Sequence, residues 1–353
     1  VVGFHKDLAG FIDTRDASTG HITKDTNDDQ SEGGRVALLF TPSDRLSVSL
    51  SALISNADRG ARNRATEDYV GTLSVPEKTQ DDIRAYNGTL RFGFDAADLV
   101  VTTSYFTRDV DSIIDQGGLV PTVNYVFGLF GIDFPVTGVF INQQVSTDTL
   151  AAEARLVSNG SGPFKWTVGA FYKDLDSKYS LVSDGVPTVP VQIWEGISQY
   201  ITGGALTIDQ GFFTGGKASN KQLAAFGEVS YDFTDHWQVI AGGRIFDEKR
   251  KSTTSYGGVF PLLTGGPPPG TSDSKGDSTI FNPRLSVRYT FSDSAMAYFT
   301  YSRGFRSGGQ NDLFALVPGG TQDFQPEKLT NYELGAKTAW LEGRMVLNAA
   351  AFY

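Results

Sequence analysis

The chain has 353 residues, of which 40% are hydrophobic, and a formal net charge of −10. This length suits one large domain or two ordinary ones, and the hydrophobic content is too high for a disordered chain. The negative charge argues against nucleic acid as a partner, because phosphate backbones select basic surfaces. The absence of cysteine excludes disulfide frameworks, zinc thiolate sites and cysteine nucleophiles.

The residue types present favour strands over helices. The chain contains 40 Gly, 25 Phe and 14 Tyr, and a chain rich in aromatic residues and glycine is typical of an all-β protein. No stretch reaches the roughly 18 consecutive apolar residues of a transmembrane helix. The first residues, VVGFHKDLAG, lack Met and a charged n-region, and the last, LNAAAFY, fall inside a strand pattern. We therefore expect an internal piece of a longer protein.

In chain order, the first predicted element is a strand within VVGFHKDLAGFID. Pairs of strands joined by a short polar turn follow it. One such pair, RLSVRYTFSDSAMAYFT, alternates Leu285, Val287 and Tyr289 with Ser286 and Arg288, which is the period of a strand with one apolar face. The turns fall at Pro42-Ser43-Asp44, Ala96-Ala97, Asn159-Gly160, Thr234-Asp235, Ser292-Asp293-Ser294 and Glu342-Gly343. The chain therefore holds about 12–13 strands.

The segments between these hairpins are long and rich in Gly, Ser, Asp, Asn and Pro. We expect loops at 57–82, 109–145 and 174–220. Strict alternation of short turns and long loops is typical of a transmembrane antiparallel β-barrel, with strands of about 9–11 residues. A large soluble β-sandwich or β-propeller is the alternative, although propeller blades require shorter and more even periods.

In a barrel the two faces of each strand meet different surroundings. The apolar faces then contact lipid, and the charged residues opposite them point into a wet or plugged lumen: Arg91, Arg155, Lys165, Glu228 and Arg288. The aromatic residues next to the short turns suit an interfacial girdle: Phe164, Trp166, Trp237 and Trp340. Lipid cannot satisfy an open sheet edge, so such a barrel must close.

The hairpins also resemble a known family. The stretches AYFTYSRGFRSGGQND and FQPEKLTNYELGAKTAWLEGRMVLNAAAFY, together with KQLAAFGEVSYDFTDHWQVIAGGRIF, ARLVSNGSGPFKWTVGAFY and LLFTPSDRLSVSLSALI, are similar to the barrel of TonB-dependent outer-membrane receptors. The most specific parts are Gly304-Phe305-Arg306-Ser307-Gly308 and the run from Pro326-Glu327 to Tyr332-Glu333-Leu334-Gly335. The resemblance covers most of the chain and weakens in the long loops.

The resemblance implies a 22-stranded barrel in the bacterial outer membrane, with an N-terminal plug domain in its lumen. Residues 1–353 then form part of the barrel domain, without the plug, the TonB box or the last strands, because Tyr353 ends a strand that family members continue past. The partners implied are the nutrient ligand, outer-membrane lipid and the TonB-ExbB-ExbD complex, which pulls on the plug.

Nothing in the sequence indicates an enzyme, a cofactor or a metal centre. The three His, at 5, 21 and 236, are scattered, and neither an HExxH nor a GxSxG motif occurs. Asp25, Asn27 and Asp29 have the spacing of a calcium loop. They lack the Gly at the sixth position and the Glu at the twelfth, which favours a solvated acidic loop over weak divalent binding.

The long loops are the expected place for ligand recognition. Their aromatic residues suit either a binding surface for an aromatic or amphipathic ligand or a loop that buries its own side chains; the candidates are Tyr125, Phe127, Phe130, Phe134, Tyr179, Trp194 and Tyr200. Arg303, Arg306 and Gln310 lie where a strand leaves the barrel. The arginines suit either an anionic ferric siderophore or, as the favoured alternative, pairing with lumen carboxylates.

These observations predict a receptor that imports a scarce, bulky nutrient, with a ferric siderophore as the first choice. Import of a glycan, a vitamin or another organic molecule is an alternative with the same fold. A passive porin or structural barrel is an alternative from another class, and a soluble carbohydrate-binding β protein is a more distant one.

Overall fold

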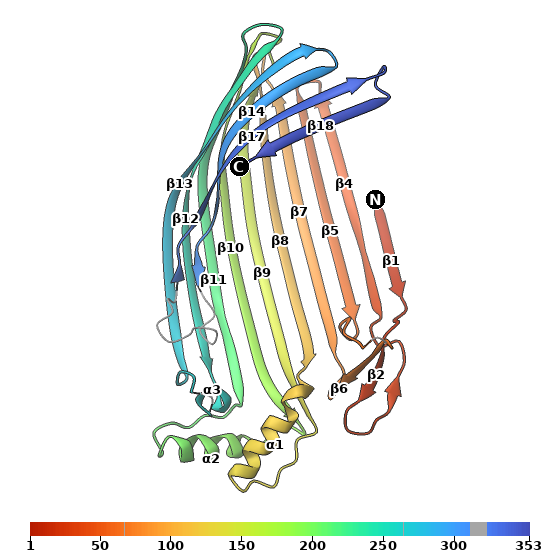
Figure 1. The fold of residues 1–353 in the computed structure, drawn as a ribbon, viewed down its shortest axis with the longest axis vertical. Coiled ribbons are helices and arrows are strands. Elements are labelled where there is room, and N and C mark those ends of the chain that lie inside the picture. The colour runs from red at the N-terminus through yellow and green to blue at the C-terminus, as the bar shows by residue number, and fades with distance from the viewer. Residues whose placement is uncertain (67, 264, 311–322) are drawn as a thin grey trace.

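A computed structural model of the chain describes residues 1–66, 68–263, 265–310 and 323–353. It consists mainly of one 13-stranded sheet, in which every strand is antiparallel to its neighbours (Figure 1). The strands in spatial order are β1 (Val2–Leu8), β4 (Asp29–Ser43), β5 (Leu46–Arg59), β7 (Lys78–Gly93), β8 (Ala97–Asp115), β9 (Gly138–Ser158), β10 (Phe164–Val186), β11 (Phe212–Asp232), β12 (Trp237–Gly257), β13 (Gly270–Ser292), β14 (Ala295–Arg306), β17 (Glu327–Trp340) and β18 (Met345–Phe352).

The order of strands across the sheet follows their order along the chain. All the short turns expected from the sequence are confirmed, because they join β4 to β5, β7 to β8, β9 to β10, β11 to β12, β13 to β14 and β17 to β18. The strand expected near the start of the chain is also confirmed, as β1. Among the described residues β1 and β18 form the two edges and do not pair with each other, so the sheet is open.

The remaining elements belong to the long connections, at the end of the sheet opposite the short turns (Figure 1). They are a three-stranded sheet of β2 (Asp13–Asp16), β3 (Ile22–Thr23) and β6 (Val70–Leu73), the two-stranded pair β15 (Gly309–Gln310) and β16 (Asp323–Phe324), the 3-10 turn η1 (Gly117–Leu119), and the helices α1 (Val120–Leu129), α2 (Val191–Ile201) and α3 (Val259–Leu263). None of the helices in the described residues has the length and apolar character to cross a membrane.

The acidic segment with calcium-loop spacing belongs to one of these connections. The side-chain carbonyl oxygen of Asn27 accepts hydrogen bonds from the backbone N–H groups of Phe11 and Ile12, at 2.7 Å each. Asn27 therefore ties the start of β4 to the segment after β1. Among the described residues no cluster of His, Cys, Asp and Glu has the geometry of a metal site.

The two faces of the sheet differ in polarity as the alternation predicts. On one face, the outer face, large apolar side chains are exposed on successive strands: Leu38, Leu50, Leu90, Val168, Leu223, Ile245, Leu285 and Leu334. On the opposite face, the inner face, Arg284 forms an ion pair with Glu228 at 3.4 Å and Arg155 one with Glu153 at 2.7 Å. An exposed apolar face is unfavourable in water and favourable in lipid, so the outer face is the lipid-contacting one.

Aromatic side chains gather where the strands meet the short turns. Trp237 contacts Tyr289 at 4.7 Å between ring centroids, and Tyr289 packs edge-on against Phe291 at the same distance. Tyr231 packs in the same way against Phe233. Amphipathic rings concentrate at membrane–water interfaces, so these contacts agree with the girdle expected at this end of the sheet.

The strands are longer than expected and the loops shorter. β9 and β10 contain 21 and 23 residues, although a membrane span needs only about 9–11. The loops predicted at 109–145 and 174–220 are observed at 116–137 and 187–211. The first residues of the loop predicted at 57–82 belong to β5, and its last residues belong to β7. The strands are longer because they continue past the apolar band with polar residues on both faces. Hydrogen bonds to neighbouring strands stabilise these extensions, and no apolar alternation marks them in the sequence.

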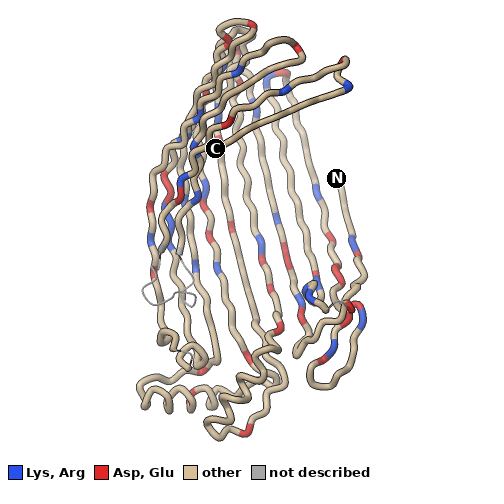
Figure 2. Tube along the Cα trace, viewed as in Figure 1, with Lys and Arg blue, Asp and Glu red and all other residues tan. Residues whose placement is uncertain are grey.

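Charged residues are unevenly distributed along the strands. Figure 2 shows that Lys, Arg, Asp and Glu are sparse in the halves of β4, β5, β7 and β8 next to the short turns and frequent in the halves toward the long connections. The apolar part of each strand therefore lies next to the short turns. The polar part extends beyond it and carries the long connections.

A matched pair of substitutions tests the assignment of the two faces. Leu50→Arg places a charge on the outer face in the middle of the apolar part of β5, where lipid raises its cost to about 2–4 kcal/mol. Ser51→Arg places the same charge on the inner face of the same strand. We expect Leu50→Arg to lower the folded, heat-modifiable protein recovered from outer membranes several-fold, with Ser51→Arg close to the unsubstituted protein. Equal losses would contradict the assignment.

Candidate ligand-binding site

Three long connections share one hydrophobic core at the end of the sheet away from the short turns. They contain α1, α2 and α3, and their buried residues form a single cluster, called the loop core here: Val123, Val126, Phe127, Val136, Val139, Val189, Trp194, Ile197, Ile208 and Val259. The connections are far apart in the sequence. The loop core therefore makes them one packed unit.

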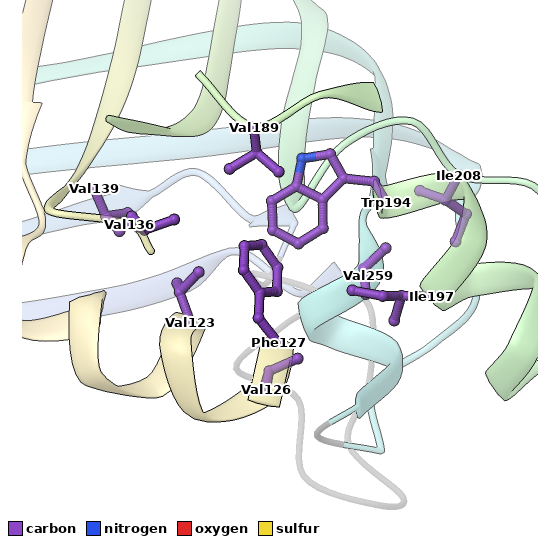
Figure 3. Close-up of a cluster of buried hydrophobic side chains, with 10 residues drawn as sticks. All are labelled: Val123, Val126, Phe127, Val136, Val139, Val189, Trp194, Ile197, Ile208 and Val259. Atoms are coloured by element: carbon purple, nitrogen blue, oxygen red, sulfur yellow. The ribbon is translucent and has the colours of Figure 1, made fainter. Parts of the chain in front are cut away.

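Phe127 and Trp194 form the centre of the loop core. Their ring centroids are 5.3 Å apart, with the ring planes tilted by 58° (Figure 3). The Trp194 ring also packs edge-on against Phe260 at 5.4 Å. Only 1% of Phe127 and 4% of Trp194 is exposed. Both side chains are thus used in packing between loops, as in the alternative in which the loops bury their own aromatic residues.

Hydrogen bonds fix the chain around this core. The Asn124 side chain donates to the carbonyl oxygen of Val136 and accepts from its N–H, both at 2.8 Å. The hydroxyl of Ser198, which is completely buried, accepts from the N–H of Ile208 at 2.9 Å. Each contact satisfies backbone groups that would otherwise be buried without a partner.

The other aromatic candidates of these loops lie at or near the surface. Phe130 and Phe134 are partly buried against the loop core. Tyr125 on α1 and Tyr200 on α2 are 68% and 78% exposed, and Tyr200 meets Phe130 edge-on at 5.5 Å. Tyr125 and Tyr200 are therefore the members of this group that present rings to solvent, and their role in ligand binding stays a prediction.

Tyr179 lies apart from them, on the inner face of β10. Its hydroxyl is 3.2 Å from the hydroxyl of Thr254 on β12. It lines a cleft of about 530 Å³ together with Asn220, Arg250, Gly276 and Phe324. This cleft lies between the inner face of β10 to β13 and the short pair β15–β16.

An apolar floor and a buried charge adjoin the cleft. Phe246 is buried with Ala224 and Ile280, and Phe305 stacks on it at 4.2 Å with an angle of 29° between the rings. Phe305 reaches this position because β14 pairs with β13 only as far as Ser302, and its end then packs over the inner face. The stretch with the family's specific run, Gly304 to Gly308, thereby covers part of β12.

Glu248 is the completely buried charge beside this floor. Its Oε1 accepts hydrogen bonds from Asn220 at 2.7 Å, Gln222 at 2.9 Å and Ser307 at 3.0 Å. Its Oε2 lies 3.7 Å from Arg250 Nε, which is an ion pair and too long for a hydrogen bond. Glu248 therefore links β11, β12 and the end of β14.

Several polar atoms of this group have no hydrogen-bond partner within the described part of the chain: Asn220 Oδ1, Glu248 Oε2, Arg250 Nε, Arg250 Nη1 and Ser278 Oγ. Buried polar atoms without partners are costly, and a buried charge more so. Arg250 also lines the cleft. The Arg250 guanidinium gives the cleft a positive charge, which suits a ligand bearing anionic oxygens.

The remaining candidates belong to the segment that leaves the sheet. Arg303 is exposed on β14, and Arg306 lies 3.9 Å from Glu327 on β17, with both side chains more than two-thirds exposed. Arg306 thus pairs with an exposed carboxylate, and exposed pairs contribute little. Pairing of these arginines with lumen carboxylates stays a prediction. Gln310 belongs to β15, which pairs with β16.

Sequence reasoning did not find Glu248, Arg250 or Asn220. One signal was available, since Glu248 and Arg250 alternate with Asp247, Lys249 and Lys251 in a strand that follows an apolar stretch. The alternation places Glu248 and Arg250 on the inner face together with Phe246. What the sequence did not show is that the end of β14 would cover them.

Two buried carboxylates hold the connection between β5 and β7. Glu77 accepts hydrogen bonds from Arg62 Nε at 3.0 Å, Arg62 N at 2.9 Å and the N–H of Asp115 at 3.0 Å. Asp115 accepts from the N–H groups of Ser74 and Val75 at 2.8 and 2.9 Å. Burial raises the pKa of Glu77, but the hydrogen bonds and charge of Arg62 outweigh it and hold that pKa below its ordinary value.

The comparison with known families agrees with this architecture. Residues 21–353 match the family described as TonB dependent receptor-like, beta-barrel. The chain belongs to this family, which is one of bacterial outer-membrane receptors and transporters.

Solved structures of the same fold are distant in sequence. The ferric yersiniabactin uptake receptor from Yersinia pestis has 15% identity and a TM-score of 0.72, and the match covers 99% of this chain and 48% of that one. The ferric-catecholate import receptor from E. coli K12, in its closed form, has 14% identity and a TM-score of 0.64, with 99% and 55% covered. A copper transporter has 14% identity and a TM-score of 0.62, with 99% and 48% covered. The chain spans about half the length of these structures.

Phe127→Ala tests whether the loop core is one unit. We expect it to cost about 3–5 kcal/mol in that unit, because it removes a completely buried ring. Hydrogen exchange should then speed up in α2 and α3 as well as in α1, with the strands next to the short turns unchanged. Tyr200→Ala, which removes an exposed ring, is the control and should leave exchange unchanged. Acceleration confined to α1 would show that the loops fold separately.

The lowered pKa of Glu77 predicts a dependence on pH. A carboxyl group whose folded pKa is depressed contributes stability above its unfolded pKa, and that stability is lost as the pH falls through the folded value. We expect Glu77→Gln to make residues 60–77 more sensitive to proteolysis at pH 7, and the difference to shrink as the pH falls below about 4. Glu342→Gln, in an exposed turn, is the control. A difference that does not change with pH would point to packing instead.

Proposed function

We propose that this chain forms the ligand-recognising barrel part of an outer-membrane receptor that imports a ferric siderophore. The observation that carries the proposal is the inner-face cleft, which Arg250 lines beside the buried carboxylate of Glu248. Within the described part of the chain, the buried Nε and Nη1 of Arg250 have no hydrogen-bond partner. Ferric siderophores present oxygen-rich, often anionic surfaces, which a fixed guanidinium recognises well. The fold shared with receptors for ferric yersiniabactin and ferric catecholates supports this choice.

Transport energy in this proposal comes from the TonB-ExbB-ExbD complex, acting on a plug domain in the barrel. The ligand enters past the loop core, with Tyr125 and Tyr200 exposed on its surface, and reaches the cleft lined by Tyr179 and Arg250. No residue in this scheme acts as a catalyst, and the proposed function is transport without chemical change of the cargo.

The test uses cells that carry the complete receptor gene or a deletion of it. We expect the receptor to be induced by iron starvation, and the deletion strain to lose growth on one siderophore as the iron source. Arg250→Gln should weaken binding of that siderophore at least about tenfold, which corresponds to the loss of one charge-assisted contact. Arg250→Lys retains the charge but not the planar guanidinium. Its affinity for the siderophore should therefore lie between the affinities of the unsubstituted receptor and of Arg250→Gln.

Each contrary result has a definite meaning. The absence of any iron response would overturn the siderophore proposal and favour a glycan, a vitamin or another organic cargo. Uptake that persists when the proton-motive force is collapsed would favour a passive porin. An iron response with unchanged binding by Arg250→Gln would retain the cargo and reject the cleft as its site.

A further inference from the structure

The end of β14 and the residues that follow it pack on the inner face of the sheet. Residues 305–309 form this segment, which is called the β14 extension here. Phe305 stacks on Phe246 at 4.2 Å between ring centroids, and the hydroxyl of Ser307 donates to Glu248 Oε1 at 3.0 Å. The extension is therefore anchored to β12 by one apolar contact and by one hydrogen bond to a buried charge.

The next residue, Gly308, brings the extension against Arg250. Gly308 is buried, and a Cβ placed on it would lie 3.1 Å from both Nη1 and Nη2 of the Arg250 guanidinium. The same Cβ would clash with the carbonyl oxygen of Phe324 on β16. This close approach of the backbone therefore requires a residue without a side chain.

A second glycine contacts the same guanidinium from the sheet. Gly276 on β13 pairs directly with Arg250 on β12, so the long Arg250 side chain reaches over a position that has no side chain. A Cβ on Gly276 would lie 2.9 Å from Nη2, 3.5 Å from Cζ and 3.6 Å from Nε of Arg250. Gly276 and Gly308 are together called the glycine slot here, because a side chain at either position would push against the guanidinium.

Confinement in the slot compensates for hydrogen bonds that this guanidinium does not make. Within the described part of the chain, the buried Nε and Nη1 of Arg250 have no hydrogen-bond partner. Glu248 Oε2 attracts the group from 3.7 Å, a distance too long for a hydrogen bond. The backbone of the sheet, the backbone of the extension and this attraction therefore set the position of the guanidinium.

The position of Arg250 decides the charge of the inner-face cleft. Lys217, Lys251, Lys275 and Asp277 also border the cleft, but the alternation along β11 to β13 directs their side chains to the outer face. Arg250 is thus the charged inner-face side chain that lines the cleft in the described part of the chain. A shift of its guanidinium would change what the cleft attracts.

We propose that Gly276 and Gly308 are specificity-determining positions of the cleft, because they hold the Arg250 guanidinium where it meets an anionic cargo. The inference rests on the proposed function, in which an anionic ferric complex binds in this cleft. Both glycines are positioning residues, since they act through Arg250. The inference also assigns roles within the run from Gly304 to Gly308: Phe305 and Ser307 anchor the extension, and Gly308 completes the slot.

The first arm of the test needs no cargo. It follows the modification of Arg250 by phenylglyoxal, a reagent for arginine, in the complete receptor in detergent, by mass spectrometry of the peptide that contains Arg250. Gly276→Ala should raise the rate at least about threefold, because the added methyl group meets only the Arg250 side chain and displaces it. Gly304→Ala is the control, since a Cβ there meets no described atom within 4 Å. An unchanged rate in Gly276→Ala would overturn the slot.

The second arm measures binding of ferric complexes to the same receptor. The probes are an anionic ferric tris-catecholate, anionic ferric dicitrate and a ferric trihydroxamate without negative charge. Gly276→Ala should weaken binding of an anionic complex at least about fivefold and leave binding of the trihydroxamate within about twofold. In the Arg250→Gln background, Gly276→Ala should have no further effect, because the two positions act through one group. Gly304→Ala should bind all probes like the unsubstituted receptor.

The outcomes separate this inference from the proposed function. Unchanged binding by Arg250→Gln, or binding of neither anionic complex, would reject the proposed site and this inference with it. An effect of Arg250→Gln without an effect of Gly276→Ala, or equal losses by Gly276→Ala in both backgrounds, would reject the slot alone. Heat-modifiable mobility shows whether each variant is folded. If Gly276→Ala does not fold, Ser307→Ala replaces it with the same expected results, because it removes an anchor of the extension without adding volume.

Discussion

The structure depends on one constraint, which is that lipid offers no hydrogen-bond partner to a peptide group. Every N–H and C=O of a membrane-crossing strand must therefore pair with a neighbouring strand. The long antiparallel registers from β4 to β14 meet this requirement, with direct pairing along nearly the whole of each strand. The alternation of side chains between lipid and interior follows from that pairing, because each residue takes the face of its partner.

Because the backbone groups pair within the sheet, the side chains of its two faces can differ in polarity. The outer face can be apolar at residues such as Leu50 and Leu223, since water does not reach it. The inner face can hold charges such as Glu248, because neighbouring strands and the end of β14 supply its partners. Polar recognition and membrane contact thus coexist on strands of ordinary composition, which explains a chain with a low hydrophobic content and a large sheet.

Outside the bilayer the hydrophobic effect stabilises the structure. The connections that carry α1, α2 and α3 lie in water and are held by burial of apolar side chains, centred on Phe127 and Trp194. Several aromatic residues that the sequence predicted as ligand contacts are instead packed in or against this core. Composition could not separate the two uses, because a buried and an exposed ring have the same sequence signal.

The sequence by itself determined the hairpins, their turns and the apolar face of each strand, since alternation and turn chemistry are local properties that pairing only makes explicit. Motifs such as Gly304 to Gly308 were sufficient to indicate the family. Only the tertiary structure decided where the strands end, which aromatic rings are buried, and that Glu248 contacts both Arg250 and Ser307 on the inner face. These features depend on contacts between residues far apart in the chain, and such contacts leave no periodic trace in the sequence.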